Sequence, residues 1–341
     1  MNAPALAGQI FIHPVNCKPE CRMNNLRVGV VGVGALGQHH ARVYASLPGT
    51  TLVGVVDTYP GRAEEIAAPL GTRVFPSHMD LFGKVDAVSI ATPTVLHAAI
   101  GEQFLKQGIH VLVEKPIAHT LEDAERLIRA AKENGRTLQV GHLERFNPAV
   151  VQLRQIVTKP RFFEAHRMGL FSPRSLDIDV VLDLMIHDLD IIGLLVPSPV
   201  ASLTAVGIAI LTNRIDIANA RIQFADGCVA NITASRVSME KIRKLRLFQK
   251  QEYISLDYSR QDVAVFSLNR KPGGGIPDIM SRKLTPEKKE PLREELQAFL
   301  DAARGLRPVE CSGEDGRNTL ALALRILTQA ERAQAVEIDR D

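Results

Sequence analysis

The chain has 341 residues, 45% of them hydrophobic and 23% charged, with a formal net charge of +3. This composition is typical of a globular protein long enough for two domains, and the small net charge gives no indication of a nucleic-acid partner. No apolar run approaches the roughly 20 residues that a membrane-spanning helix needs, so we predict no membrane association. The four cysteines form no disulfide framework, and we expect a cytoplasmic protein.

Residues 1–25 differ from the rest of the chain, and we interpret them as a flexible N-terminal extension. They contain three prolines and show no sustained hydrophobic period. They also lack the charged start and the small-residue cleavage site of a signal peptide. Cys17, Cys21 and His13 offer three metal ligands without a visible fourth, so we predict no metal site. A chain that begins at Met23 should therefore fold normally.

The first strand leads into a glycine-rich turn that is typical of dinucleotide binding. Residues 26–31 form an apolar run, and residues 35–47 then have helical spacing. Glycines at such a turn let backbone N–H groups approach a pyrophosphate, and the helix N-terminus adds a partial positive charge. The residues of the turn that we predict to bind the cofactor are Gly32, Gly34, Ala35, Leu36 and Gly37.

A second apolar strand, residues 51–56, ends in Asp57, which lies 20 residues after Gly37. A carboxylate at this position accepts hydrogen bonds from the ribose hydroxyls and repels a 2′-phosphate. We therefore predict NAD as the cofactor in preference to NADP. The nearby Arg62 would instead favour NADP, because an arginine can accommodate the 2′-phosphate.

Strands and helices continue to alternate as far as residue 140. Further strands are expected at 73–75, 85–90, 108–113 and 137–140, with helices at 95–107 and 120–134. The strand at 108–113 ends in Glu114-Lys115-Pro116, and open α/β sheets bind ligands at the carboxyl ends of their strands. The pattern predicts an α/β Rossmann domain with a doubly wound parallel sheet over residues 26–143.

Residues 144–341 have a different pattern and predict an α+β substrate-binding and oligomerisation domain. After a helix at 147–157, strand-like segments occur at 162–168, 201–211, 215–224, 228–235, 245–248, 253–258 and 263–268. Two helices follow, at 291–304 and 316–333. We expect a large, mostly antiparallel sheet, and a face of that sheet without helices would favour a homodimer or homotetramer.

A helix is also expected over residues 179–190, and it carries Asp183, His187 and Asp190 on one face. Histidine titrates near neutral pH, so a positioned His187 is suited to take a proton from a hydroxyl. The alternative is that Asp183 and His187 form an ordinary pair on the helix surface.

Taken together, these motifs resemble the Gfo/Idh/MocA oxidoreductases, and the resemblance covers nearly the whole chain after Met23. It rests on the glycine turn, on Ala91-Thr92-Pro93 with His97, on Glu114-Lys115-Pro116, and on Asp183 with His187. The resemblance implies that Lys115 orients the reacting hydroxyl, that His187 is the acid/base, and that Asp183 holds the substrate or the histidine. It also implies that five further residues bind the cofactor: Thr92, Pro93, His97, Glu114 and Lys115.

More narrowly, residues 141–148, 171–174 and 183–190 resemble those of the UDP-N-acetylglucosamine 3-dehydrogenases of lipid A biosynthesis. This resemblance implies NAD-dependent oxidation of a sugar 3-hydroxyl to a ketone, which a partner aminotransferase then uses. Other members of the family act on free sugars, inositols or sugar-nucleotide acids, and no motif excludes them. A further alternative is a non-catalytic NAD-binding regulator, because a fold alone does not fix a function.

A nucleotide-sugar substrate carries a diphosphate, which arginine and lysine bind well. The residues that we predict to bind the substrate are Arg145, Asn147, Arg174, Asp183 and His187. Arg167 and the basic segment 236–250 offer further cations, although that segment also has the pattern of a solvated sheet edge. Aromatic residues do not alternate with its charges, as they do in single-stranded nucleic-acid sites.

Overall fold

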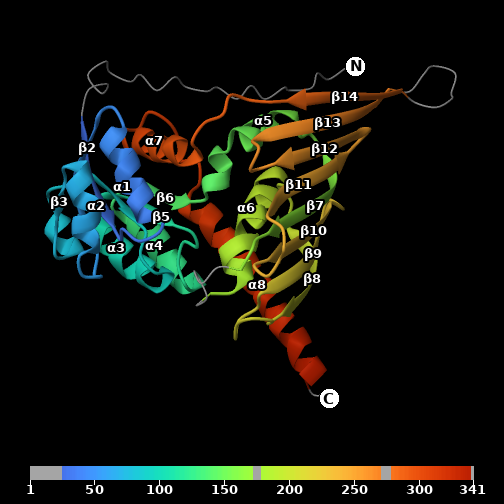
Figure 1. Cartoon of the computed structure of the whole chain (residues 1–341), viewed down its shortest axis with the longest axis horizontal. Coiled ribbons are helices and arrows are strands. Elements are labelled where there is room, and N and C mark those ends of the chain that lie inside the picture. Colours follow the sequence, from blue (N-terminus) through green and yellow to red (C-terminus); the bar gives the residue numbers. More distant parts are fainter. Residues whose placement is uncertain (1–24, 172–177, 270–277, 339–341) are drawn as a thin grey trace, which may run out of the picture.

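The computed structural model describes residues 25–171, 178–269 and 278–338. The described residues form two sheets that lie side by side (Figure 1). Helices surround the first sheet, and further helices lie between the two sheets. The first sheet consists of β1 (Leu26–Val31), β2 (Thr50–Val56), β3 (Arg73–Val74), β4 (Ala87–Ile90), β5 (His110–Glu114) and β6 (Leu138–Gly141).

The first sheet has the strand order β3-β2-β1-β4-β5-β6, and all neighbouring strands are parallel. The order reverses between β1 and β4, which places a ligand crevice at their carboxyl ends. Every residue of β4 is buried, because parallel sheets are covered on both faces. The predicted doubly wound sheet is confirmed.

Helices cover both faces of this sheet. One face packs against α1 (Gly37–Ser46) and α2 (Arg62–Leu70), and the other against α3 (His97–Lys106) and α4 (Leu121–Glu133). Thr120 begins α4 as predicted, because its hydroxyl accepts a hydrogen bond from the Asp123 amide at 3.1 Å. Short 3₁₀ turns lie at His78–Leu81, Thr94–Leu96 and Leu143–Phe146.

The second sheet has eight strands in the order β14-β13-β12-β11-β7-β10-β9-β8. Neighbouring strands are antiparallel except for β7 and β10, which pair in parallel, so the prediction of a mostly antiparallel sheet is confirmed. The strands are β7 (Pro160–Met168), β8 (Val200–Ile208), β9 (Ile217–Phe224), β10 (Val229–Ser235), β11 (Ile242–Gln249), β12 (Glu252–Asp257), β13 (Asp262–Asn269) and β14 (Asp278–Leu284).

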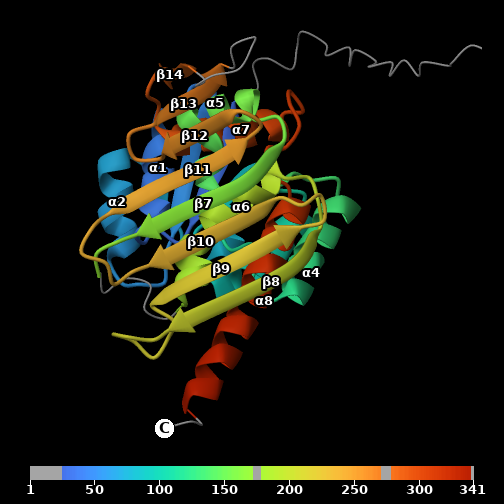
Figure 2. The same ribbon diagram turned by 90° about the vertical axis from the view of Figure 1, so that its right-hand side faces the viewer.

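One face of this sheet packs on helices, and Figure 2 shows the other face in front of them with no helix over it. The covered face packs against α5 (Pro148–Ile156), a π-helical turn (Val181–Met185) and α6 (Ile186–Leu195). Buried and exposed residues alternate along β9 because the sheet has one covered face. The edge strand β14 was not predicted, since six of its seven residues are exposed and leave no alternating pattern.

The two C-terminal helices, α7 (Pro291–Ala303) and α8 (Gly313–Ile338), return to the first domain. Phe299 of α7 packs in the same hydrophobic core as Tyr44 of α1. Leu320 of α8 belongs to the other core of the first domain, whereas Ile326 belongs to the core of the second. Among the described residues, no helix is both long enough and apolar enough to cross a bilayer.

Candidate active site

The glycine turn after β1 is shaped for close approach of a ligand. Gly32 has φ +82, and a Cβ on it would lie 2.7 Å from the Ala91 carbonyl oxygen. A Cβ on Gly37 would lie 1.8 Å from the Gly32 carbonyl oxygen, whereas nothing lies within 4 Å of a Cβ position on Gly34. The first turn of α1 contains no acid and no side-chain cap, so the positive end of the helix dipole faces the turn without a side-chain carboxylate to neutralise it.

Asp57 follows β2 and has a fixed orientation. Its Oδ2 accepts a hydrogen bond from the Val33 amide at 2.7 Å, and its Oδ1 accepts one from the Tyr59 amide at 2.9 Å. Arg62 donates through Nε to the Val33 carbonyl and through Nη1 to Glu65 at 2.7 Å. These contacts hold Arg62 beside the glycine turn, while the two amides fix the Asp57 carboxylate where it repels a 2′-phosphate.

His97 connects the loops that follow β4 and β5. Its Nδ1 lies 2.9 Å from the Pro116 carbonyl oxygen and its Nε2 lies 2.9 Å from the Thr92 carbonyl oxygen. The side chain is buried, and this burial lowers its pKa. His97 therefore holds the loop that carries Lys115, and the peptide bond between Lys115 and Pro116 is cis.

Glu114 ends β5 as a buried carboxylate. Its Oε1 lies 3.0 Å from Nε2 of the buried His40, and its Oε2 accepts a hydrogen bond from the Lys115 amide at 3.2 Å. Burial alone would raise the pKa of Glu114, but the contact with His40 and the positive charge of Lys115 hold it below its usual value. The carboxylate thus fixes the backbone from which Lys115 extends.

Lys115 reaches across to the second domain. Its Nζ donates a hydrogen bond to the Asp183 carbonyl oxygen at 2.7 Å and lies 3.4 Å from Asp183 Oδ1. The two side chains are only 11% and 25% exposed, so little water screens their charges. Asp183 therefore pairs with Lys115 and not with His187, which removes the ordinary helix-surface pair as the explanation for Asp183.

Asp183 lies in the π-helical turn and His187 in the first turn of α6. A π-helical turn contains more residues than an α-helical one and changes the register of the helix. His187 and Asp190 lie three residues apart within α6, but only His187 lines the cavity, because Asp190 is buried against Arg145. The sequence pattern predicted a regular α-helix over 179–190 and did not indicate the π-helical turn that carries Asp183.

His187 is held in its neutral form. Burial, followed by the nearby cations Lys115 and Arg167, lowers its pKa well below the ordinary value of 6.5. Its Nδ1 is buried and has no hydrogen-bond partner among the residues described. A neutral imidazole beside a lysine is a suitable acceptor for a hydroxyl proton.

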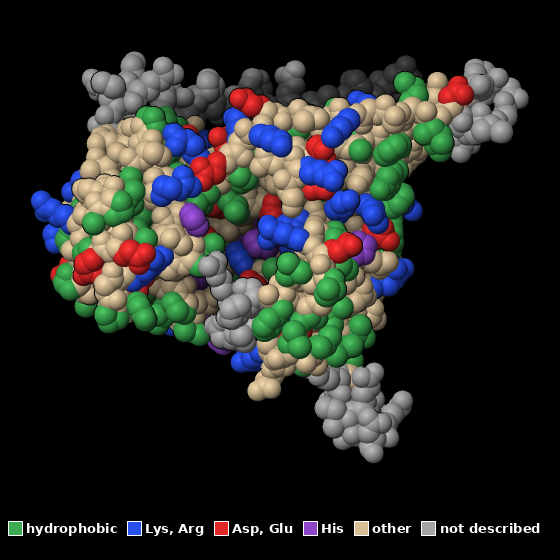
Figure 3. All heavy atoms as spheres, viewed as in Figure 1, with side chains coloured by type: hydrophobic (Ala, Val, Ile, Leu, Met, Phe, Trp, Pro, Cys, Tyr) green, Lys and Arg blue, Asp and Glu red, His purple; other side chains and the backbone are tan. Residues whose placement is uncertain are grey.

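A cavity of about 850 Å³ lies between the two domains, and Lys115, Asp183 and His187 line it. Figure 3 shows the surface hollowed there, with Lys and Arg side chains around the hollow. The first domain contributes residues that include Gly34, Ala35, Leu36, Arg62, Glu114 and Lys115. The second contributes Glu144, Arg167, Asp183, Leu184, His187 and Arg243. The three predicted catalytic residues thus meet five of the predicted cofactor residues at one site, whereas the other predicted cofactor residues do not line it: Gly32, Gly37, Asp57, Thr92, Pro93 and His97.

Comparison with known proteins agrees with this geometry. Residues 26–142 match the model of an oxidoreductase family with an NAD-binding Rossmann fold. A UDP-N-acetylglucosamine 3-dehydrogenase of Acidithiobacillus ferrooxidans is 42% identical over 310 residues, which are 91% of this chain and 98% of that protein. The chain belongs to the Gfo/Idh/MocA oxidoreductase family.

Two further comparisons place the chain within this Gfo/Idh/MocA family. A solved structure of the Acidithiobacillus ferrooxidans enzyme matches with a TM-score of 0.84 at 41% identity, covering 90% of this chain and 98% of the other. A scyllo-inositol 2-dehydrogenase (NAD(+)) of Bacillus subtilis is 27% identical over 338 residues, 93% of this chain and 97% of that protein. The family, the fold and NAD as the cofactor, all predicted from the sequence, are confirmed.

The residues present fit NAD. The open approach at Gly34 and the positive N-terminus of α1 suit a pyrophosphate, and the fixed Asp57 carboxylate suits a ribose without a 2′-phosphate. Lys115 and His187 lie in the same cavity as this turn. The chain is an NAD-binding oxidoreductase.

Two predicted substrate residues lie elsewhere. Arg145 is 4% exposed in its side chain and donates to both oxygens of Asp190, at 2.7 and 2.8 Å. Asn147 caps α5 and donates to Glu144 and to the Tyr258 carbonyl oxygen. Neither lines the cavity. Arg174, also predicted, lies outside the described residues.

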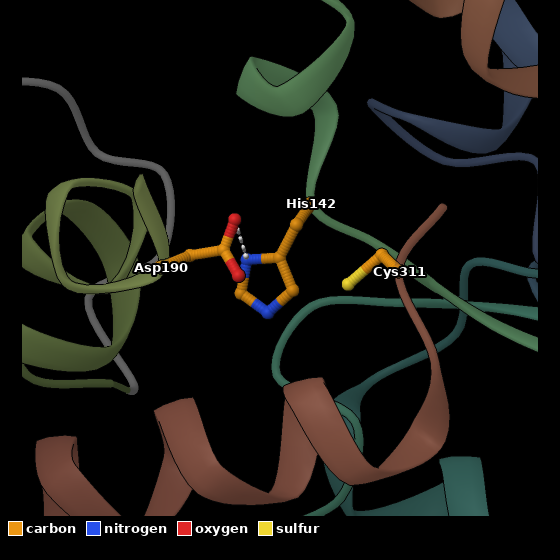
Figure 4. Close-up of side chains that lie close together, drawn as sticks. All are labelled: His142, Asp190 and Cys311. Carbon is orange, nitrogen blue, oxygen red and sulfur yellow. Dashed lines mark ion pairs between the residues drawn. The ribbon is translucent and has the colours of Figure 1, made fainter. Parts of the chain in front are cut away.

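Asp190 also belongs to a buried cluster with His142 and Cys311 (Figure 4). Their potential ligand atoms lie within 4.8 Å of one another. His142 Nδ1 is 3.9 Å from Asp190 Oδ2, and burial lowers the pKa of His142, so the ring is neutral. Burial raises the pKa of the Cys311 thiol well above its usual value. Since Arg145 already satisfies the Asp190 charge, we interpret the cluster as a structural link between the domains.

Glu144 lines the cavity but was not assigned a role from the sequence, and Arg243 was considered only as one cation of the basic segment 236–250. Glu144 accepts a hydrogen bond from Arg167 at 3.0 Å, and Arg167 also pairs with Asp188. The alternation of β11 held a usable signal for Arg243, because it shares a face with the buried Leu245. An inward-facing arginine at the end of such a strand is a candidate for a site residue.

Proposed function

We propose that the protein uses NAD to oxidise the 3-hydroxyl of UDP-N-acetylglucosamine to the 3-keto nucleotide sugar. The observation that carries this proposal is the 42% identity with the UDP-N-acetylglucosamine 3-dehydrogenase of Acidithiobacillus ferrooxidans over 98% of that protein. The cavity supports it, because Lys115, Asp183 and His187 converge there beside the glycine turn.

In this proposal His187 removes the hydroxyl proton. Its Nδ1 is buried, so Nε2 is the ring nitrogen available to the substrate. The low pKa of His187 keeps that nitrogen unprotonated at neutral pH. Bound NAD supplies the hydride acceptor, and the hydride leaves the same carbon whose hydroxyl loses the proton.

Lys115 orients the hydroxyl and stabilises the developing alkoxide. A cation has a larger effect where neighbouring groups exclude water, and the Lys115 side chain is 11% exposed. Asp183 fixes the position of Nζ through its carbonyl oxygen and its carboxylate. His97 and Glu114 in turn fix the loop from which Lys115 extends.

We also propose a cytoplasmic homodimer or homotetramer that supplies a keto sugar to an aminotransferase in lipid A biosynthesis. An aromatic ladder on the sheet face without helices supports the oligomer. Phe248 has its ring centroid 5.8 Å from that of Phe162 and 5.0 Å from that of Tyr253, which lies 5.6 Å from Phe266. Exposed apolar patches of this kind mark protein interfaces.

The test is oxidation of UDP-N-acetylglucosamine by the purified protein with NAD, followed by NADH formation and by mass spectrometry of the sugar nucleotide. We expect the product to have lost two hydrogens and to react with a hydrazine as a ketone. Free N-acetylglucosamine and myo-inositol are the comparison substrates. Faster turnover of myo-inositol would support the second candidate, a polyol dehydrogenase like the Bacillus subtilis relative.

A further inference from the structure

Four cationic side chains line the cavity within the described ranges, and they differ in whether their charge is matched. Three have acidic neighbours within hydrogen-bond or ion-pair distance. These pairs are Arg62 with Glu65, Lys115 with Asp183, and Arg167 with Asp188. The fourth is Arg243, for which the described part of the chain provides no side-chain hydrogen bond or ion pair. It is therefore the cavity cation that remains for a ligand.

Arg243 lies where its charge is unfavourable without a partner. It is half-buried, and it lies directly across the sheet from Arg167 in the pairing of β11 with β7. Burial and then the Arg167 charge lower the pKa of Arg243, and the more distant carboxylates of Glu144, Asp188 and Asp183 offset this only in part. A guanidinium cannot lose its proton under ordinary conditions, so it requires an anion or strong acceptor to offset the cost of burial.

The position of Arg243 separates it from the cofactor's phosphates. It extends from β11 of the second domain, on the covered face that also carries Leu245. The glycine turn that suits the NAD pyrophosphate belongs to the first domain. Arg243 is also close enough to His187 to contribute to lowering the pKa of that residue, so it lies beside the reaction centre.

From this arrangement we infer that Arg243 binds the diphosphate of a nucleoside diphosphate sugar and gives the enzyme its preference for such substrates over uncharged polyols. The inference rests on the proposed function and deepens it. A guanidinium presents donors in a fixed fork that matches phosphate oxygens, and charge-assisted hydrogen bonds of this kind are about twice as strong as neutral ones.

The experiment is calorimetric titration with UDP in the presence of saturating NADH, which keeps UDP away from the cofactor site. The variants are Arg243→Gln, Arg243→Lys and a matched control, Arg260→Gln. The control removes the same charge from a side chain that is 76% exposed on a turn. NADH affinity and melting temperature, measured on every variant, report whether the fold is intact.

We expect Arg243→Gln to weaken UDP binding on the order of 10- to 100-fold, Arg243→Lys to retain part of the affinity, and Arg260→Gln to bind like the unmodified protein. In turnover, the KM for UDP-N-acetylglucosamine should rise by a similar factor in Arg243→Gln. Equal UDP affinity in the unmodified protein and in a folded Arg243→Gln would overturn the inference, as would a loss confined to NADH.

The two proposals fail in different ways. If UDP binding depends on Arg243 but no UDP-sugar is oxidised, the diphosphate site stands and the proposed reaction is wrong. If UDP-N-acetylglucosamine is oxidised and Arg243→Gln binds UDP unchanged, the reaction stands and the assignment of Arg243 is overturned. If Arg243→Gln does not fold, the folded Arg243→Lys variant decides the question. An unchanged UDP affinity of Arg243→Lys, together with a reduced kcat, would place Arg243 at the sugar and not at the phosphates.

Discussion

Replacing Arg145 with Met should destabilise the fold and leave substrate affinity nearly unchanged. The side chains of Arg145 and Asp190 are 4% and 1% exposed, and they are joined by hydrogen bonds of 2.7 and 2.8 Å. Arg145 also donates to the Glu310 carbonyl oxygen at 2.8 Å. Removing it leaves the Asp190 carboxylate buried without its counterion, which costs about 3–5 kcal/mol. The melting temperature should fall by roughly 4–7 °C, because the unfolding entropy of a chain of this length is about 0.7 kcal/mol/K.

The assay is urea denaturation followed by circular dichroism, together with the KM for UDP-N-acetylglucosamine. The double variant Arg145→Met, Asp190→Leu should recover most of the loss, because a buried ion pair is often replaceable by apolar groups. Arg154→Met is the control, since its side chain is 37% exposed and pairs with Glu310 at the surface, and it should cost less than about 1 kcal/mol. A stable Arg145→Met with a strongly raised KM would refute this reasoning and return Arg145 to the substrate site.

Three more predictions concern the cavity. His187→Ala should lower kcat by roughly 10²- to 10⁴-fold, while NAD affinity, measured by titration, stays unchanged. The losses of kcat in His187→Ala and Lys115→Ala should be less than additive in the double variant. A near-normal kcat in His187→Ala would contradict the role of His187. Because the pKa of His187 lies well below 6.5, its neutral form persists on acidification, so kcat/KM should hold at pH 6.5 and decline only below it; a decline that begins above pH 6.5 would contradict this. Asp57→Ala should weaken NAD binding and narrow the preference over NADP, and equal kcat/KM for both cofactors in the unmodified protein would show that Asp57 does not discriminate.

Local sequence patterns were sufficient for the first domain and for the catalytic lysine. Buried parallel strands are continuous apolar runs, and each one ends at a recognisable break such as Gly32 or Asp57. Lys115 follows directly from its place at the end of β5, since strand ends share one edge of the sheet. These features depend on neighbours in the sequence, which is what a pattern can record.

Pairing between distant residues could not be predicted in the same way. Arg145 and Asp190 are 45 positions apart, and Lys115 and Asp183 are 68 apart. In the sequence, a buried structural arginine such as Arg145 and a cavity arginine such as Arg243 look alike. The π-helical turn at Val181–Met185, which carries Asp183, also could not be predicted from α-helical spacing.

The position of helix α8 limits where this chain can be joined to a related protein to make a chimera. It supplies Leu320 to a core of the first domain and Ile326 to that of the second, while α7 adds Phe299 to the other core of the first. The chain after residue 290 therefore belongs in part to the NAD-binding half. A chimera joined to a relative at residue 143 would give the first domain foreign C-terminal helices and mismatched cores. The unit that can be exchanged intact is the middle of the chain, between the end of the first domain and the start of α7.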